Sequence, residues 1–264
     1  RLAGWPDGAG DATEEVAADY GADPLLPQLL HFAHARMLQA SGGSADDYLR
    51  AVQRLLAMPD PPGDPGRRAT LHVVLSQACA WAGRLREALA ASDVALASIG
   101  QVSTFDTDFI GFNVEQWAIG LRVRVLCRMG RLAEARACHA RLAALARQEP
   151  DVVMKGIEHG VALELDCLHG RPQRAWDRVR QLDRLARQQN DYLRVADAYF
   201  HSLLEVSSHH YASACTQIQD GLAALRTRRV AVDFEAELLA LWAEALAARR
   251  AWPLAAQTAH QCVG

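Results

Sequence analysis

The fold of this chain is decided by the stretch Gly83-Arg84-Leu85-Arg86-Glu87-Ala88, which recurs as Gly130-Arg131-Leu132-Ala133-Glu134-Ala135 and Gly170-Arg171-Pro172-Gln173-Arg174-Ala175. Each copy stands between two segments with helical apolar spacing. Glycine supplies the left-handed conformation that ends the first helix, and the alanine five positions later lets two helices approach closely. A unit of this kind, repeated along the chain, predicts a series of helical hairpins.

The turn position continues along the chain where the glycine does not. His209 and Arg250 follow Gly170 at intervals of about forty residues, and Gly43 precedes Gly83 by a similar interval. We therefore expect an all-α protein, a right-handed superhelical array (α-solenoid) of about six TPR-like helical hairpins. Alternating β-branched residues of the kind that predict strands are absent from the sequence, which argues against a two-domain α/β fold.

Apolar residues three and four positions apart, together with turn residues, set the predicted helices. Their ranges are 13–20, 25–38, 48–58, 68–82, 85–99, 108–129, 132–148, 152–169, 172–189, 192–206, 211–226, 232–248 and 252–262. Asp46 is the expected cap of the helix at 48–58, and Asp106 or Thr107 that of the long helix at 108–129. The proline-rich stretch 59–66 is either a long loop between hairpins or a domain boundary. We expect a boundary that divides N-terminal helices with a capping hairpin (1–63) from the repeat array (64–264).

Composition narrows the class of protein further. The 264 residues are 50% hydrophobic with a net charge of −3, so no basic surface for nucleic acid is expected. No apolar run reaches the ~18 residues of a membrane span, and no secretory leader is predicted. Lys155 is the only lysine in an alanine- and arginine-rich chain. These features favour a cytoplasmic, bacterial protein, and the abrupt ends suggest a fragment of a longer chain.

Residues that would carry chemistry are few. None of the six cysteines forms a C-x-x-C pair, and all fall in predicted helices, so we expect buried free thiols. Phosphate-binding, nucleophile-elbow and zinc-protease motifs are absent. We therefore predict no enzyme, no metal and no cofactor. His209-His210 is expected to be a polar turn, and His201 and Glu205, one helical turn apart, are expected to pair.

The repeated phrase resembles the tetratricopeptide (TPR) repeat, in which glycine and alanine five positions later mark the hairpin turn. The resemblance covers mainly 68–189 and, more weakly, 190–263. The period near forty residues is longer than the ~34 typical of that family. The usual aromatic and glycine positions of its first helix are also missing, since the corresponding slots hold other residues: His72, Leu75, Ser76 and Cys79 in one repeat and Ile119, Arg122, Val123 and Leu126 in another.

Longer alanine- and leucine-rich repeats, such as 222–226 with 241–245, are similar to the C-terminal arrays of bacterial signal-transduction ATPases. These include MalT-like LuxR-family activators and multidomain adenylate cyclases. The resemblance implies a non-catalytic binding module of a signalling or transcription-regulatory protein, which takes a protein or peptide partner or a small effector and acts on other domains of the parent chain. Neither membrane nor nucleic acid is an expected partner of this segment.

The open face of the outgoing helices is where such a groove would bind. Its predicted lining is polar and mixed in charge, and consists of Asn113, Gln116, Arg124, Lys155, His159, Asp166, Asp197 and His201. The same residues could instead form an ordinary solvated helix face. Two other functions stay open: a structural oligomerisation scaffold, and an α/α-type enzyme that uses His159, Asp166 or His201 in its groove. Three of the six tryptophans, Trp117, Trp176 and Trp242, are expected in the core.

Overall fold

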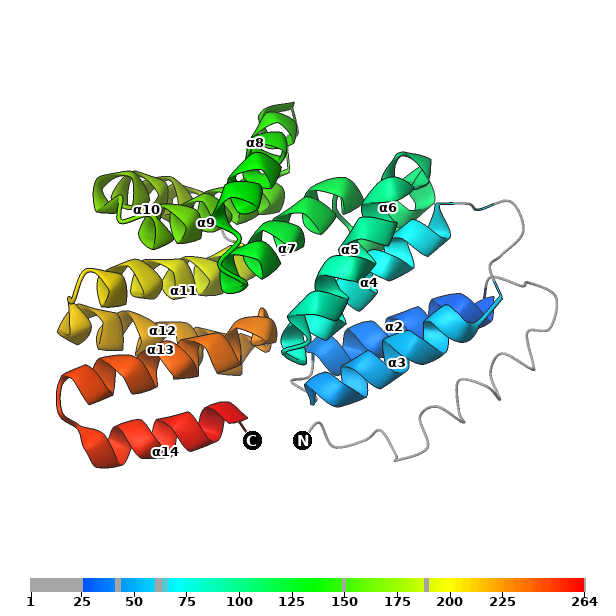
Figure 1. Cartoon of the computed structure of the whole chain (residues 1–264). Coiled ribbons are helices and arrows are strands. Elements are labelled where there is room, and N and C mark those ends of the chain that lie inside the picture. The colour runs from blue at the N-terminus through cyan, green and yellow to red at the C-terminus, as the bar shows by residue number, and fades with distance from the viewer. Residues whose placement is uncertain are drawn as a thin grey trace. The chain divides into compact units, whose positions relative to one another are not determined.

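The computed structural model describes residues 26–40, 44–59, 64, 66–148, 151–187 and 190–263, and within this part all regular structure is helical (Figure 1). The described residues contain no strand, which confirms the all-α class. The helix predicted at 13–20 and the turn at Gly43 lie outside the described residues. Among the described helices, none is both long enough and apolar enough to cross a membrane.

The chain forms two compact units, Arg1–Leu121 and Arg122–Gly264. The helices of the first unit are α2 (Leu26–Ala40), α3 (Ala45–Ala57), α4 (Arg67–Trp81), α5 (Leu85–Ala97), α6 (Thr104–Ile110) and the start of α7 (Val114–Arg128), with a 3-10 turn at Ile99–Gln101. Within it, α2 packs on α3, α3 on α4 and α4 on α5. The division predicted between 63 and 64 adjoins residues outside the described part and stays a prediction.

The second unit contains the end of α7 and seven further helices. These are α8 (Leu132–Gln148), α9 (Val152–Leu168), α10 (Pro172–Ala186), α11 (Asp191–Ser207), α12 (Tyr211–Arg228), α13 (Glu235–Ala248) and α14 (Trp252–Val263), with a 3-10 turn at Val232–Phe234. Three hairpins pair α9 with α10, α11 with α12 and α13 with α14 (Figure 1). Each hairpin packs on the next through α10 against α11 and α12 against α13, and α11 also contacts α9 and α13.

All five described turn positions adopt the same backbone conformation. The φ angles are +72° at Gly83, +72° at Gly130, +63° at Gly170, +63° at His209 and +62° at Arg250. At each turn, the N–H of the following residue bonds to the carbonyl five positions earlier, at 2.8–2.9 Å. A second bond links the turn N–H to the carbonyl three positions earlier. This pair of bonds is the Schellman motif, and it confirms that the two non-glycine positions continue the series of turns.

The alanine predicted at the crossing of each hairpin is buried. Ala88, Ala135 and Ala175 are 0% exposed. The corresponding alanines after the two non-glycine turns, Ala214 and Ala255, are buried as well. Each of these five turns therefore has the same two elements. One is a left-handed turn residue, and the other is a buried alanine five positions later.

Glycine in place of Arg250 is expected to stabilise the protein. Arg250 holds a left-handed φ in an exposed turn, a conformation that disfavours a side chain with Cβ by about 1–2 kcal/mol. The free energy of unfolding of Arg250→Gly, measured by urea titration, should rise by about 1 kcal/mol, less than the full strain because glycine gains entropy when unfolded. The matched variant Gly83→Ala should lose a similar amount. An unchanged value for both would contradict this account of the turns.

Two predicted helix boundaries are wrong. The single helix expected at 108–129 is two helices, because Gly111 adopts a left-handed φ of +88° and ends α6, and Asn113 accepts the N–H of Gln116 at 3.0 Å to begin α7. The helix expected at 232–248 begins with a 3-10 turn and is α-helical only from Glu235.

Two predicted caps are also wrong. Ser44 caps α3 by accepting the N–H of Asp47, whereas Asp46 lies inside the helix. Ser103 caps α6 by accepting the N–H of Asp106. In both cases a serine two or three residues before the expected cap supplies the acceptor, so the helix begins earlier than the acidic residues suggested.

The core of the second unit is continuous from α9 to α14. Two glycines on α9 allow α11 to approach closely, since a Cβ added at Gly156 would lie 2.4 Å from Leu193 and one at Gly160 would lie 2.2 Å from Phe200. Trp117 of α7 is buried, whereas Trp176 and Trp242 are partly buried against this core. All six cysteines are free, but only three of them are buried: Cys79, Cys127 and Cys215.

Candidate functional site

The eight residues predicted to line a binding face lie in separate places. Asn113 caps α7, and Gln116 is 1% exposed, so neither presents a free surface group. Both belong to the first compact unit, and the other six belong to the second. Lys155 is half-buried in the first turn of α9. Four of the remaining five belong to three clusters in the second unit, and the fifth, Asp166, lines a pocket.

The first cluster surrounds Arg124 of α7. Its guanidinium bonds to Glu164 of α9 at 3.3 Å and to Glu237 of α13 at 2.6 Å, and Arg128 pairs with the same Glu237. The guanidinium carbon also lies 5.5–5.9 Å from the ring centres of Tyr199, Phe200 and Phe234. Charge pairing and cation–π contact thus join α9, α11, α13 and the 3-10 turn at Val232–Phe234 to one cation of α7.

The electrostatics of this cluster fit a structural role. Burial alone would lower the pKa of Arg124, but the charge of Glu164 and the neighbouring tyrosines raise it above its usual value. Burial raises the pKa of the adjacent Cys127 thiol to about 12. Because both carboxylates and the guanidinium already satisfy one another, the cluster stabilises the packing of these helices and offers no free group to a ligand.

The second cluster is centred on Glu158 of α9, which is 5% exposed. His139 of α8 contacts one carboxylate oxygen at 2.8 Å, and His159 contacts the other at 2.9 Å. Arg178 of α10 lies 3.6 Å from the second oxygen and 3.1 Å from Nδ1 of His159. Burial favours the neutral acid, yet the two histidine contacts and the Arg178 charge hold the pKa of Glu158 well below its usual range. This carboxylate therefore ties α8, α9 and α10 together as an anion.

The third cluster lies on α11, where Asp197 and His201 face α10. His201 lies 3.7 Å from Glu205, as the predicted pairing requires, and its ring meets Trp176 edge-on at 5.5 Å. The Oδ1 atom of Asp197 is buried without a hydrogen-bond partner among the described residues. Burial, with the charge of Asp183 as a smaller cause, raises the pKa of Asp197 to about 7.

The raised pKa of Asp197 predicts a pH-dependent stability. The folded chain binds this proton more tightly than the unfolded chain, so the stability is fully present below the unfolded pKa of 3.8 and is lost as pH rises towards about 7. Asp197→Asn should therefore raise the free energy of unfolding by roughly 1–3 kcal/mol at about pH 8 and change it little near about pH 4. Urea titrations at both pH values measure the difference. The exposed Asp220→Asn is the control, and equal effects of the two substitutions would reject the assignment.

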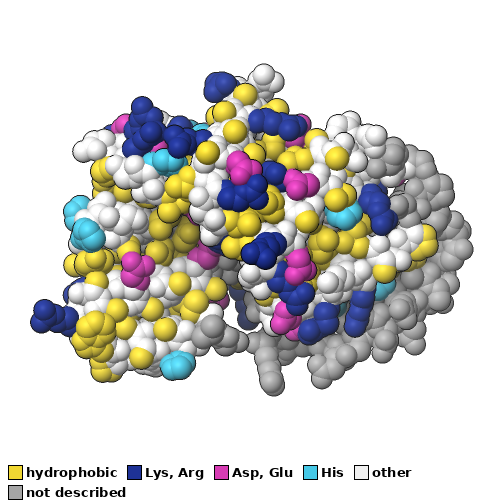
Figure 2. Space-filling view, in the orientation of Figure 1, with side chains coloured by type: hydrophobic (Ala, Val, Ile, Leu, Met, Phe, Trp, Pro, Cys, Tyr) yellow, Lys and Arg dark blue, Asp and Glu magenta, His cyan; other side chains and the backbone are white. Residues whose placement is uncertain are grey.

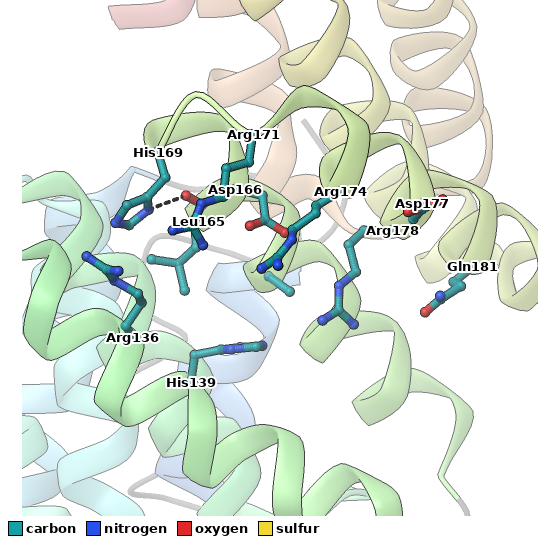
Figure 3. Close-up of a pocket in the computed structure, with 11 residues that line it drawn as sticks. Arg136, His139, Leu165, Asp166, His169, Arg171, Arg174, Asp177, Arg178 and Gln181 are labelled. Atoms are coloured by element: carbon teal, nitrogen blue, oxygen red, sulfur yellow. Dashed lines mark hydrogen bonds between the residues drawn. The ribbon is translucent and has the colours of Figure 1, made fainter.

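A pocket of about 490 Å³ opens between α8, α9 and α10, beside the Glu158 cluster (Figure 3). Two histidines and four arginines line it: His139, His169, Arg136, Arg171, Arg174 and Arg178. Its other lining residues are Ala162, Leu165, Asp166, Asp177 and Gln181. The charged lining is thus mainly basic, and Figure 2 shows basic side chains (Lys and Arg) gathered over this part of the surface. Of the predicted residues, only Asp166 lines this pocket.

Three of the pocket arginines make no ion pair with any described residue, although the carboxylate of Asp166 lines the same pocket. Among the described residues, Arg136, Arg171 and Arg174 make no side-chain hydrogen bond or ion pair, whereas Asp177 is already paired with Arg180. Close positive charges repel one another when no anion lies between them. This arrangement contrasts with the satisfied Arg124 cluster, and it makes the pocket the best candidate for a binding site.

The pocket also breaks the repeated turn phrase. The fourth position after the turn is Glu87 in one hairpin and Glu134 in another, but it is Arg174 in the hairpin of α9 and α10. A carboxylate in the first turn of a helix is favoured by the helix dipole, whereas an arginine there is not. Sequence reasoning recognised the turn but did not use this exchange of charge, which could have identified Arg174. His139 and Arg136 carry no comparable sequence signal, because only the packing of α8 on α9 brings them here.

Within the described residues, no group of three or more histidine, cysteine, aspartate or glutamate side chains could hold a metal ion. The basic lining of the pocket is also unsuited to a cation, so its chemistry is that of anion binding. In comparisons with known proteins, no family model, curated protein or solved structure matches this chain.

Proposed function

We propose that this chain is a non-catalytic binding module, an α-solenoid of about six TPR-like hairpins, that takes an anionic ligand or an anionic group of a partner in the pocket between α8, α9 and α10. The observation that carries the proposal is the set of three arginines around that pocket that make no ion pair with any described residue. A bound anion would supply the missing negative charge and bridge α8 to α10. The chain's own fold gives these side chains no other partner among the described residues.

The repeated turn supports the solenoid. Five turns share one Schellman geometry, and the hairpins of the second unit pack in the order of the sequence. Arrays of this kind bind on surfaces formed where neighbouring helices meet, and they vary the exposed residues while keeping the packing residues. The α8–α10 pocket has that character, since its hairpin keeps Gly170 and Ala175 and changes the residue between them.

Regulation is the role that such binding would serve. An anion held by Arg136 of α8, by Arg171 just before α10 and by Arg174 of α10 favours one relative position of those helices over others. In a longer signalling or transcription-regulatory protein of bacterial type, that preference would bias contacts with the other domains of the parent chain. The enzyme alternative is weaker, because its candidate catalytic residues do not share one site. His201 packs on Trp176, whereas Asp166 lines the pocket.

Isothermal titration calorimetry on the whole chain tests the proposal. Inorganic phosphate, citrate and an acidic peptide are the anionic probes, and a lysine-rich peptide is the cationic control. We expect saturable binding of at least one anion at a single site, weakening as salt is added. Arg136→Ala/Arg171→Ala should weaken it by at least about tenfold, whereas Arg184→Ala, on α10 outside the pocket, should not. A folded chain that binds none of the anions would overturn the proposal.

A further inference from the structure

We infer that the α8–α10 pocket recognises the phosphomonoester group of a small, hydroxylated, non-aromatic metabolite. This inference rests on the proposed function, because it names the ligand class for the same pocket. It draws on three features of the pocket: the number and placement of the free guanidinium groups, the end of the helix that opens into it, and the mixture of residues that line the remaining space.

The charge and geometry favour a phosphate over a carboxylate. A phosphomonoester carries close to two negative charges at neutral pH and has three terminal oxygens arranged around phosphorus. A carboxylate is planar, carries one charge and is satisfied by a single bidentate arginine. Here three guanidinium groups that make no ion pair with a described residue line one space: Arg136 comes from α8, Arg171 from the turn before α10 and Arg174 from α10 (Figure 3). A tetrahedral dianion matches that supply of donors.

The beginning of α10 adds to this preference. No side chain caps this end of the helix, and its first turn contains no acidic residue. Pro172 has no N–H, and the Arg171 N–H donates to the carbonyl of Asp166. The N–H groups of Gln173 and Arg174, together with the helix dipole, are therefore what attract an anion at this end. Arg171 and Arg174 flank it, so the backbone and the side chains favour the same charge. In the helices that start after Gly83 and Gly130, Glu87 and Glu134 occupy the first turn instead.

One buried atom of the pocket has no partner. Nδ1 of His169 lies 2.6 Å from the carbonyl oxygen of Leu165 and must donate to it, since a carbonyl only accepts. The other ring nitrogen, Nε2, is buried and lacks a hydrogen-bond partner among the described residues. In the neutral ring that nitrogen accepts, so it suits a hydroxyl group of a ligand.

The remaining space describes the organic part of the ligand. The pocket is much larger than a phosphate ion and falls within the range of ~300–1,000 Å³ that small ligands occupy. Its lining contains Asp166 and Gln181, which can bond to hydroxyl groups, and no phenylalanine, tyrosine or tryptophan ring on which a nucleobase could stack. These residues favour a sugar or polyol phosphate over a nucleotide.

Calorimetry with glucose phosphate as the main probe tests the inference on the whole chain. Glucose phosphate should bind at least about tenfold more tightly than citrate or AMP, and glucose should show no binding. Citrate or an acidic peptide binding more tightly than glucose phosphate would overturn the phosphate assignment and leave the proposed function intact. A phosphoserine peptide binding more tightly than glucose phosphate would overturn the metabolite assignment. If no anion binds, both the inference and the proposed function fail.

Arg174→Glu is the sharpest variant, because it gives this hairpin the residue that two other hairpins already carry. The chain should fold as well as the original, with an unchanged or higher urea midpoint, yet lose at least about a hundredfold in affinity for glucose phosphate through charge reversal. Arg184→Glu makes the same change of charge on the same helix outside the pocket and should keep binding within about threefold. Binding by Arg174→Glu equal to that of the original chain would overturn the inference.

Discussion

Asp106→Ala is expected to lower the free energy of unfolding by about 3 kcal/mol, because it leaves a buried arginine without its closest counter-charge. Asp106 of α6 is 0% exposed and lies 2.9 Å from Arg67 of α4, which is 2% exposed and is otherwise paired with Asp64 at 3.3 Å. Thr70 also donates its hydroxyl to Asp106 at 2.9 Å. Urea titration of the purified variant measures the loss.

The electrostatics of Asp106 explain why this loss does not mean that the pair is a net source of stability. Burial raises the pKa of Asp106, and the charge of Arg67 and the Thr70 hydroxyl only partly oppose that effect. Removing both charges in Arg67→Met/Asp106→Leu should therefore recover most of the lost free energy. Asp46→Ala, which loses only an exposed pair with Arg84, should change stability by less than about 0.5 kcal/mol. A small effect of Asp106→Ala alone would contradict the buried pairing.

Gly160→Val should have a similarly large effect, about 3 kcal/mol of destabilisation, through overpacking between α9 and α11. A Cβ at Gly160 would lie 2.2 Å from Cε2 of Phe200 and 2.6 Å from two other atoms of that ring. Phe200 is 3% exposed and packs edge-on against Tyr199, so the ring has little space into which it can move. Thermal and urea unfolding of the variant check the prediction.

A size-switch variant separates this mechanism from a general intolerance of valine. Phe200→Ala alone should be destabilised by about 3–5 kcal/mol, but Gly160→Val/Phe200→Ala should lose less than the sum of the two, since the valine occupies part of the vacated space. Gly100→Val meets open space and should be close to neutral. Additive losses in the double variant would show that contact with Phe200 is not the cause.

The sequence predicted the hairpins well because their closing chemistry is local. A left-handed turn residue and a small residue five positions later are both visible in the chain, and α8 has the predicted bounds, 132–148. The same reasoning failed at Gly111, because apolar residues with helical spacing continue on both sides of the break between α6 and α7. Ile110 and Phe112 fit a helical pattern, so the pattern outweighed a glycine and an asparagine that end one helix and begin the next.

The candidate site was much harder to predict because it depends on packing between helices. Arg124 was predicted to line an open polar face, and only the structure shows that Glu164 and Glu237 satisfy it. Arg136 and His139 reach the pocket only because α8 packs on α9. The helical spacing of residues in the sequence does not show whether a neighbouring helix neutralises a given charge. The pocket is identified by arginines that no described helix pairs with.

The Schellman turns also have a consequence for how the chain folds. Each turn closes with hydrogen bonds between residues at most five apart, and each helix of the second unit packs mainly on helices near it in sequence. Contacts of short sequence separation require little loop closure, so hairpins can form early and independently. Hydrogen exchange should accordingly proceed hairpin by hairpin, with different hairpins opening at different free energies, instead of in one global event.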